Sequence, residues 1–185
     1  PEDIVEAIHY AEANGAVICN LSFGSTQYDE SVAQAIQNSK MLFIVAAGNG
    51  DSYGNGYDID ANPVYPASLP YDNIITVGNI LFDGNLDESS NWGVQNVDLA
   101  APGVYILSTV TGGGYGYMSG TSMAAPMVTG AAALVYSSHP QLDVLGVKQT
   151  LLNSARKTDA LAGKVLTGGM LDVGAAMAYG QTPQS

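Results

Sequence analysis

The strongest constraint on the fold is an alternation of helical segments with short apolar strands in the first 50 residues. One of these strands, Met-Leu-Phe-Ile-Val-Ala-Ala at residues 41–47, contains no polar side chain, which is typical of a strand buried on both faces. In chain order we expect a helix over residues 3–13, a buried strand over 16–22, a helix over 29–39 and the strand over 41–47. The pattern predicts a three-layer α/β fold with a mainly parallel sheet flanked by helices.

The remainder of the chain continues this pattern without an internal repeat or a low-complexity linker. We expect strands over 74–80 and near 97–100, a glycine-rich hairpin over 111–117, a long helix over about 121–138, and helices near 143–155 and 172–179. A chain of 185 residues is long enough for one hydrophobic core and too short to demand two. We therefore interpret residues 1–185 as belonging to a single domain.

Composition argues against two classes of partner. The chain has 17 acidic and 5 basic residues and a formal net charge of −12, so no nucleic-acid partner is expected, because phosphate contacts need clustered Lys and Arg. No apolar stretch reaches the roughly 20 residues of a membrane-spanning helix, so no membrane span is expected. The single cysteine, Cys19, lies in a strand-like run and is interpreted as a buried apolar side chain.

Ser122 lies at the start of the predicted long helix, in the run Gly-Thr-Ser-Met-Ala-Ala-Pro at residues 120–126. A hydroxyl at this position is close to the positive end of the helix dipole, where free backbone N–H groups can stabilise an oxyanion. The small neighbouring residues would let a substrate backbone approach. Ser122 is therefore a candidate nucleophile. The alternative is that Ser122 only caps the helix, which is one of the commonest uses of Ser.

Asn49 follows the apolar strand, in the run Ala-Ala-Gly-Asn-Gly at residues 46–50. In open α/β sheets, ligands bind beyond the carboxyl ends of the strands, so the amide of Asn49 is placed to donate to a developing oxyanion. The alternative interpretation is an ordinary Asn-Gly turn.

Together, these two runs resemble the signature segments of the subtilisin-like serine peptidases. Four further segments resemble this family, at residues 20–24, 65–68, 98–103 and 168–173. The resemblance covers nearly the whole chain and implies a subtilisin-like fold. It also implies a serine endopeptidase that forms an acyl-enzyme at Ser122, with Asn49 and the backbone N–H of Ser122 holding the oxyanion.

The resemblance further implies a substrate cleft for a peptide or protein. Ser22, Phe23 and Gly24 would pair with the substrate backbone as a strand. Ala46, Ala47 and Gly48 would line the pocket for the residue before the cut. Val64 resembles the position at the base of that pocket, and its branched side chain would make the pocket shallow and apolar. We expect a preference for medium-sized uncharged residues.

The family places its catalytic Asp and His before the Ser along the chain, and both would precede Pro1. His9 and His139 lie outside the family motifs, so neither is expected to be the general base. We therefore expect residues 1–185 to be the C-terminal portion of a single peptidase domain, with the N-terminal part of the fold absent. Without that part as a partner, the chain would be inactive and would not fold stably. The alternative is a catalytically inactive relative that binds peptides or other partners.

The chemistry of this family requires no cofactor, but the resemblance suggests structural calcium and an extracellular location. Asp98, with carbonyl groups around Ala67 and Leu69, resembles a weak cation site of the family. The loops at 58–62 and 83–87 also space oxygen ligands at alternate positions. The alternative is that these carboxylates are simply solvated.

Overall fold

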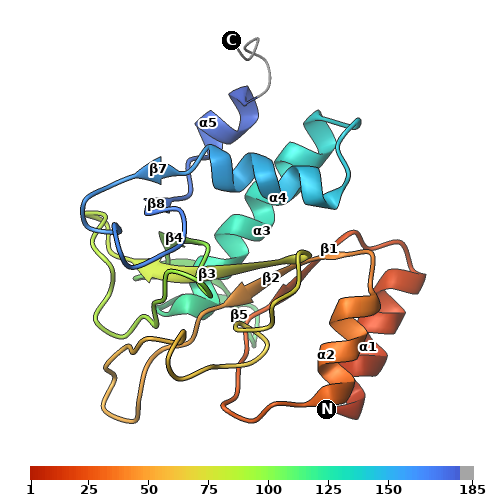
Figure 1. The fold of residues 1–185 in the computed structure, drawn as a ribbon, viewed down its shortest axis with the longest axis horizontal. Coiled ribbons are helices and arrows are strands. Elements are labelled where there is room, and N and C mark those ends of the chain that lie inside the picture. The colour runs from red at the N-terminus through yellow and green to blue at the C-terminus, as the bar shows by residue number, and fades with distance from the viewer. Residues whose placement is uncertain (180–185) are drawn as a thin grey trace.

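Six strands form one sheet in this computed structural model, which describes residues 1–179 (Figure 1). In spatial order they are β1 (Ile18–Leu21), β2 (Leu42–Ala46), β3 (Ile74–Ile80), β4 (Leu99–Pro102), β8 (Gly169–Met170) and β7 (Arg156–Lys157). Every neighbouring pair from β1 to β8 is parallel, and β7 alone is antiparallel to its neighbour. The predicted mainly parallel α/β sheet is confirmed.

Helices cover both faces of this sheet (Figure 1). On one side lie α1 (Glu2–Ala13) and α2 (Glu30–Asn38), and on the other lie α3 (Thr121–Ser138), α4 (Val144–Asn153) and α5 (Val173–Ala178). The side chains of β2 alternate between the two resulting cores. Phe43 and Val45 belong to one, and Leu42, Ile44 and Ala46 to the other. This alternation explains why an unbroken apolar run is needed at residues 42–46.

Helix α3 is the central helix of its layer and contacts four strands, β1 to β4. Its buried face consists largely of alanines, including Ala124, Ala125, Ala131 and Ala132. Small side chains let the helix approach the sheet closely, which brings its amino end to the carboxyl ends of the strands. The predicted bounds of this helix, residues 121–138, agree with the structure.

Strand β1 differs from its prediction as a buried strand over residues 16–22. Among the described residues it pairs only with β2, and Ile18, Cys19 and Asn20 remain partly exposed. An edge strand lacks a neighbour on one side, and the sequence pattern does not reveal which strand is at an edge. The interpretation of Cys19 as a buried apolar side chain is therefore correct only in part, because Cys19 packs against the core but remains partly exposed. The thiol is half-buried, and this burial raises its pKa.

The glycine-rich hairpin also differs from its prediction over residues 111–117. Its strands are β5 (Ile106–Val110) and β6 (Gly114–Met118), so the pairing begins earlier than expected and only residues 111–113 form the turn. Gly112 and Gly113 have φ values of 90° and 82°, a conformation that favours glycine.

None of the helices within residues 1–179 combines the length and the apolar character of a membrane span.

Candidate active site

The predicted site residues gather in a hollow between the carboxyl ends of β1 and β2 and the amino end of α3. The hollow has a volume of about 270 Å³. Seven of the nine predicted catalytic and substrate-binding residues line it: Phe23, Gly24, Ala46, Gly48, Asn49, Val64 and Ser122. These residues come from four separate segments of the chain, so their convergence is a property of the fold.

Ser122 is the second residue of α3, and it is tied to the end of β1 by two reciprocal hydrogen bonds. The Oγ of Ser122 donates to the carbonyl of Ser22 at 3.1 Å, and the Oγ of Ser22 donates to the carbonyl of Ser122 at 2.9 Å. In a regular helix the carbonyl of Ser122 would accept the N–H of residue 126, but Pro126 has none. The hydroxyl of Ser22 takes that place and fixes the backbone of the candidate nucleophile.

Ser22 is itself held by two polar residues that the sequence analysis did not single out. The Nδ2 of Asn20 donates to the Oγ of Ser22 at 2.8 Å, and the Oγ1 of Thr129 donates to the Oδ1 of Asn20 at 2.8 Å. Thr129 lies two turns along α3 from Ser122. The chain of hydrogen bonds therefore connects β1 to α3 beside the site.

Asn49 is exposed in the hollow, and its amide is oriented by Thr121. The Oδ1 of Asn49 accepts the backbone N–H of Thr121 at 2.8 Å and the Oγ1 of Thr121 at 2.9 Å. Thr121 is fully buried, and its Oγ1 also accepts the N–H of Gly48 at 3.1 Å. With Oδ1 occupied, the Nδ2 of Asn49 is the donor that remains for a ligand. Thr121 belongs to the run at residues 120–126, but the sequence does not reveal this role.

Val64 forms the floor of the hollow between two glycines. Its Cγ1 lies 3.0 Å from the point where a Cβ on Gly24 would stand and 3.9 Å from the corresponding point on Gly48. Val64 is buried, so its branched side chain fills the space beneath both walls. A side chain on Gly24 would press against Val64, which would have to shift to make room.

Two predicted residues do not line the hollow. Ala47 is fully buried in the core, its N–H donates to the carbonyl of Val77, and its own carbonyl accepts the Nδ2 of Asn91. Ser22 lies beside Ser122, as described above, rather than at the wall. Asn91 does line the hollow, although no feature of the sequence analysis pointed to it.

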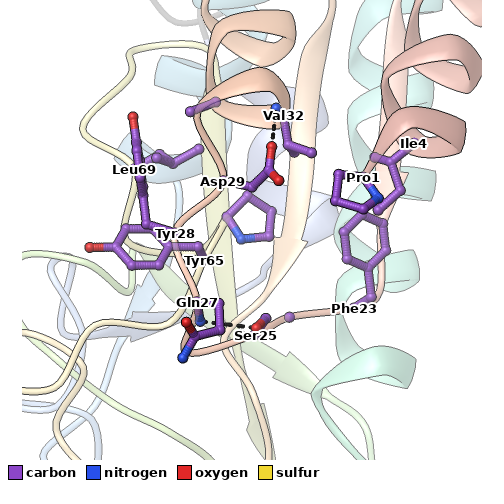
Figure 2. Close-up of a pocket in the computed structure, with 13 residues that line it drawn as sticks. Pro1, Ile4, Phe23, Ser25, Gln27, Tyr28, Asp29, Val32, Tyr65 and Leu69 are labelled. Atoms are coloured by element: carbon purple, nitrogen blue, oxygen red, sulfur yellow. Dashed lines mark hydrogen bonds between the residues drawn. The ribbon is translucent and has the colours of Figure 1, made fainter.

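A second, mainly apolar hollow of about 440 Å³ adjoins the first (Figure 2). Figure 2 shows Phe23 beside Pro1 and Ile4. Tyr28 and Tyr65 pack edge to face, with ring centres 5.2 Å apart. Phe23, Gly24 and Ser25 line both hollows, so the two hollows are neighbours.

Comparison with known proteins shows the family of this chain. The family model described as the Subtilase family matches residues 1–171. The chain belongs to the subtilase family. Thermophilic serine proteinase of Bacillus sp. (strain AK1) is 42% identical over 138 residues, covering 73% of this chain and 32% of that protein. Subtilisin DY of Bacillus licheniformis is 36% identical over 155 residues, covering 82% of this chain and 54% of that protein.

Solved structures of subtilases agree with the fold. A mutant of the protease domain of PatA has a TM-score of 0.80 and 33% identity, over 95% of this chain and 64% of that one. The prenylagaramide maturation protease PagA has a TM-score of 0.80 and 33% identity, over 95% of this chain and 65% of that one. The chain thus spans about a third to a half of the curated subtilases named above, and about two thirds of these solved chains.

Neither of the chain's two histidines lines the hollow, and the hydroxyl of Ser122 donates to Ser22. His139 caps the carboxyl end of α3, an 18-residue helix about 27 Å long that has Ser122 at its other end. Its Nδ1 lies 3.3 Å from the carbonyl of Val135. His9 is exposed on α1. Within residues 1–179, therefore, no histidine contacts the hydroxyl of Ser122.

Asp98 is buried, and its Oδ2 accepts the N–H of Thr76 at 2.7 Å. Burial raises the pKa of Asp98 to about 6, although the charge of Lys148 and the N–H of Thr76 act in the opposite direction. Within residues 1–179, no group of three or more His, Cys, Asp or Glu side chains could hold a metal ion. Calcium binding at Asp98 stays a prediction.

The loop carboxylates considered as calcium ligands are engaged with backbone groups. Asp60 accepts the N–H groups of Gln95 and Asn96 at 2.9 Å each, and so holds a neighbouring loop. Asp83 accepts the N–H of Asn85 at 3.0 Å within its own turn. These hydrogen bonds give the carboxylates a structural use without a cation.

Proposed function

We propose that this chain supplies the nucleophile, the oxyanion hole and most of the substrate cleft of a subtilisin-like serine endopeptidase. The observation that carries the proposal is the meeting of Ser122 and Asn49 in one hollow, with the Oδ1 of Asn49 bound to Thr121 so that Nδ2 is left as a donor. Membership of the subtilase family supports the same chemistry.

In the proposed reaction, the Oγ of Ser122 attacks the carbonyl carbon of the scissile peptide bond while its proton passes to a histidine. The developing oxyanion accepts hydrogen bonds from the Nδ2 of Asn49 and from the backbone N–H of Ser122 at the start of α3. The intermediate collapses to an acyl-enzyme as the leaving amine takes the proton. Water, deprotonated by the same histidine, then hydrolyses the ester and releases Ser122.

The general base is proposed to come from an N-terminal part of the same peptidase domain, which would also carry the catalytic Asp. Two observations support this division. The family orders its triad as Asp, His and Ser, and neither His9 nor His139 lines the hollow that contains Ser122. We use "complete catalytic unit" for this chain combined, covalently or as a second chain, with the part that carries the Asp and His. The chain alone is proposed to be inactive.

The cleft favours an extended peptide with apolar side chains. The backbone of residues 22–24 would pair with the substrate, and the side chain before the cut would enter the hollow floored by Val64. A further side chain of the substrate would occupy the adjoining apolar hollow beside Phe23 (Figure 2). The specificity test is turnover of peptides with Phe, Leu, Ala or Lys before the cut. A clear preference for Lys would contradict an apolar floor.

The direct test of the function is labelling by a fluorophosphonate, which reacts with activated serines. The complete catalytic unit should be labelled at Ser122 and should cleave peptides, and the chain alone should do neither. Labelling of the chain alone would refute the proposed division of the triad. Peptide binding by the complete unit without labelling or turnover would favour the alternative, a catalytically inactive relative.

A further inference from the structure

We propose that Asn91 is a positioning residue of the oxyanion hole, because it holds the loop that presents Asn49. This inference rests on the proposed function, since it concerns the geometry of the same donor. Asn91 comes from the segment between β3 and β4 and is only 1% exposed. It makes no hydrogen bond to Asn49 itself and binds the backbone on both sides of it.

Before Asn49 in the chain, Asn91 binds two carbonyl groups. Its Nδ2 donates to the carbonyl of Ala47 at 3.0 Å, and its backbone N–H donates to the carbonyl of Gly48 at 2.9 Å. These two bonds fix the direction in which the chain leaves β2.

After Asn49, Asn91 binds two N–H groups. Its Oδ1 accepts the N–H of Gly50 at 3.1 Å and the N–H of Tyr57 at 3.1 Å. One carboxamide therefore holds the chain on both sides of Asn49, through Nδ2 before it and through Oδ1 after it. Asn is suited to this position because it offers a donor and two acceptor sites on a short side chain.

The close approach of Asn91 explains the glycine that precedes Asn49. A Cβ on Gly48 would stand 2.5 Å from the Nδ2 of Asn91, a distance that real Cβ atoms do not show. Gly48 also has a φ of 100°, which favours glycine. The loop is therefore shaped around the amide of Asn91.

Asn91 is in turn anchored to the sheet through Ser90. The Oγ of Ser90 donates to the carbonyl of Asn91 at 3.0 Å and accepts the N–H of Asn79, on β3, at 2.9 Å. The loop around Asn49 is thus linked to a central strand. An oxyanion donor is effective only if it is fixed before the charge develops, and this linkage supplies such fixation.

Replacing Asn91 with Ala would leave the carbonyl of Ala47 and the N–H groups of Gly50 and Tyr57 without their partner. The loop would relax, and the Nδ2 of Asn49 would move from its position. Because a misplaced donor affects the transition state more than substrate binding, kcat should fall about 10-fold while KM stays within about twofold. The stability would also fall, so a loss of activity alone would not identify the role.

The experiment is a double-mutant cycle in the complete catalytic unit, measuring kcat and KM of the unmodified protein, Asn49→Ala, Asn91→Ala and the double variant below their unfolding temperatures. If Asn91 acts through Asn49, Asn91→Ala should lower kcat about 10-fold in the unmodified protein and less than about twofold in the Asn49→Ala background. If Asn91→Ala does not fold, the same cycle with Asn91→Ser, which keeps a polar side chain, decides the question.

Asn73 provides the matched control. Its Nδ2 donates to the carbonyls of Ile36, Ser39 and Met41, near the opposite end of β2. Asn73→Ala should lower the unfolding temperature and leave kcat unchanged.

Two results would overturn the inference: an equal loss of kcat in both backgrounds of the cycle, or an unchanged kcat in both Asn91 variants. If Asn49→Ala itself leaves kcat unchanged, the proposed function fails, and this result is distinct from a failure confined to Asn91.

Discussion

The two ends of β2 are braced by the same kind of side chain, with different consequences. At the amino end, the amide of Asn73 donates to three carbonyls that close the turn after α2. At the carboxyl end, the amide of Asn91 both donates and accepts, and the loop that it holds exposes Asn49 to solvent. Under the proposed function, similar hydrogen bonds serve stability at one end of a parallel strand and position an oxyanion donor at the other, the end at which ligands bind.

The largest expected effect on kcat is at Ser122, which lies beside the carboxyl end of β2. Ser122→Ala in the complete catalytic unit should lower kcat about 10⁶-fold, a magnitude established on a subtilisin rather than derived from this structure. Its unfolding temperature should change little, because the bond from Ser22 to the backbone carbonyl of Ser122 remains. Peptide turnover and thermal unfolding check both statements. Residual turnover above about 1% would indicate another nucleophile.

The next effect compares two glycines with similar φ values. Gly48 has a φ of 100° and Gly15 a φ of 88°, but a Cβ on Gly15 would meet nothing within 4 Å. Gly15→Ala should cost about 1 kcal/mol of unfolding free energy for the backbone conformation alone. Gly48→Ala should cost about 2–4 kcal/mol, since its Cβ also collides with Asn91, and should lower kcat. Urea unfolding measures the loss of unfolding free energy in both variants. Equal losses would show that Asn91 does not restrict the space at Gly48.

A smaller effect concerns pH and should leave catalysis untouched. The pKa of Asp98 is raised to about 6, so the native state binds a proton more readily than the unfolded chain. The contribution of Asp98 to stability therefore falls as pH rises from about 4 to 6. Asp98→Asn, which does not titrate, should gain about 2 kcal/mol relative to the unmodified protein between pH 4 and pH 7. Unfolding free energies of both proteins across this pH range test the prediction. A difference between the two proteins that does not change with pH would contradict the raised pKa of Asp98.

The smallest effect is expected at the amino end of β2. Asn73→Ala should cost about 1 kcal/mol of unfolding free energy, because the three carbonyls lose one shared donor while that of Ile36 keeps the N–H of Ser39. Urea unfolding and peptide turnover would be compared in one preparation. A fall in kcat as large as that of Asn91→Ala would remove the distinction between the two ends.

Much of the fold could be predicted because its signals are local. The apolar run of β2 and the small-residue pattern of α3 each specify an element from neighbouring residues alone. The exposure of β1 and the extent of the β5–β6 hairpin could not be predicted in this way. Edge position depends on which strands are neighbours in space, and β5 has exposed side chains without a clear apolar alternation.

The site was only partly predictable for a related reason. Ser122 and Asn49 lie in recognisable runs of residues. Thr121, Asn20 and Asn91 act through hydrogen bonds to residues 72, 109 and 41 positions away, respectively, and no local pattern encodes such contacts. Ala47 shows the converse, since it belongs to a motif and yet packs into the core beneath the site.

The proposed function requires the hollow around Asn49 and Ser122 to stabilise an oxyanion during peptide hydrolysis. The most direct measurement is kcat for Asn49→Ala in the complete catalytic unit, with KM determined on the same peptide. We predict a loss of about 10²–10³-fold in kcat, a magnitude known from a subtilisin, with little change in KM. A kcat within twofold of the unmodified protein would contradict this role of the hollow.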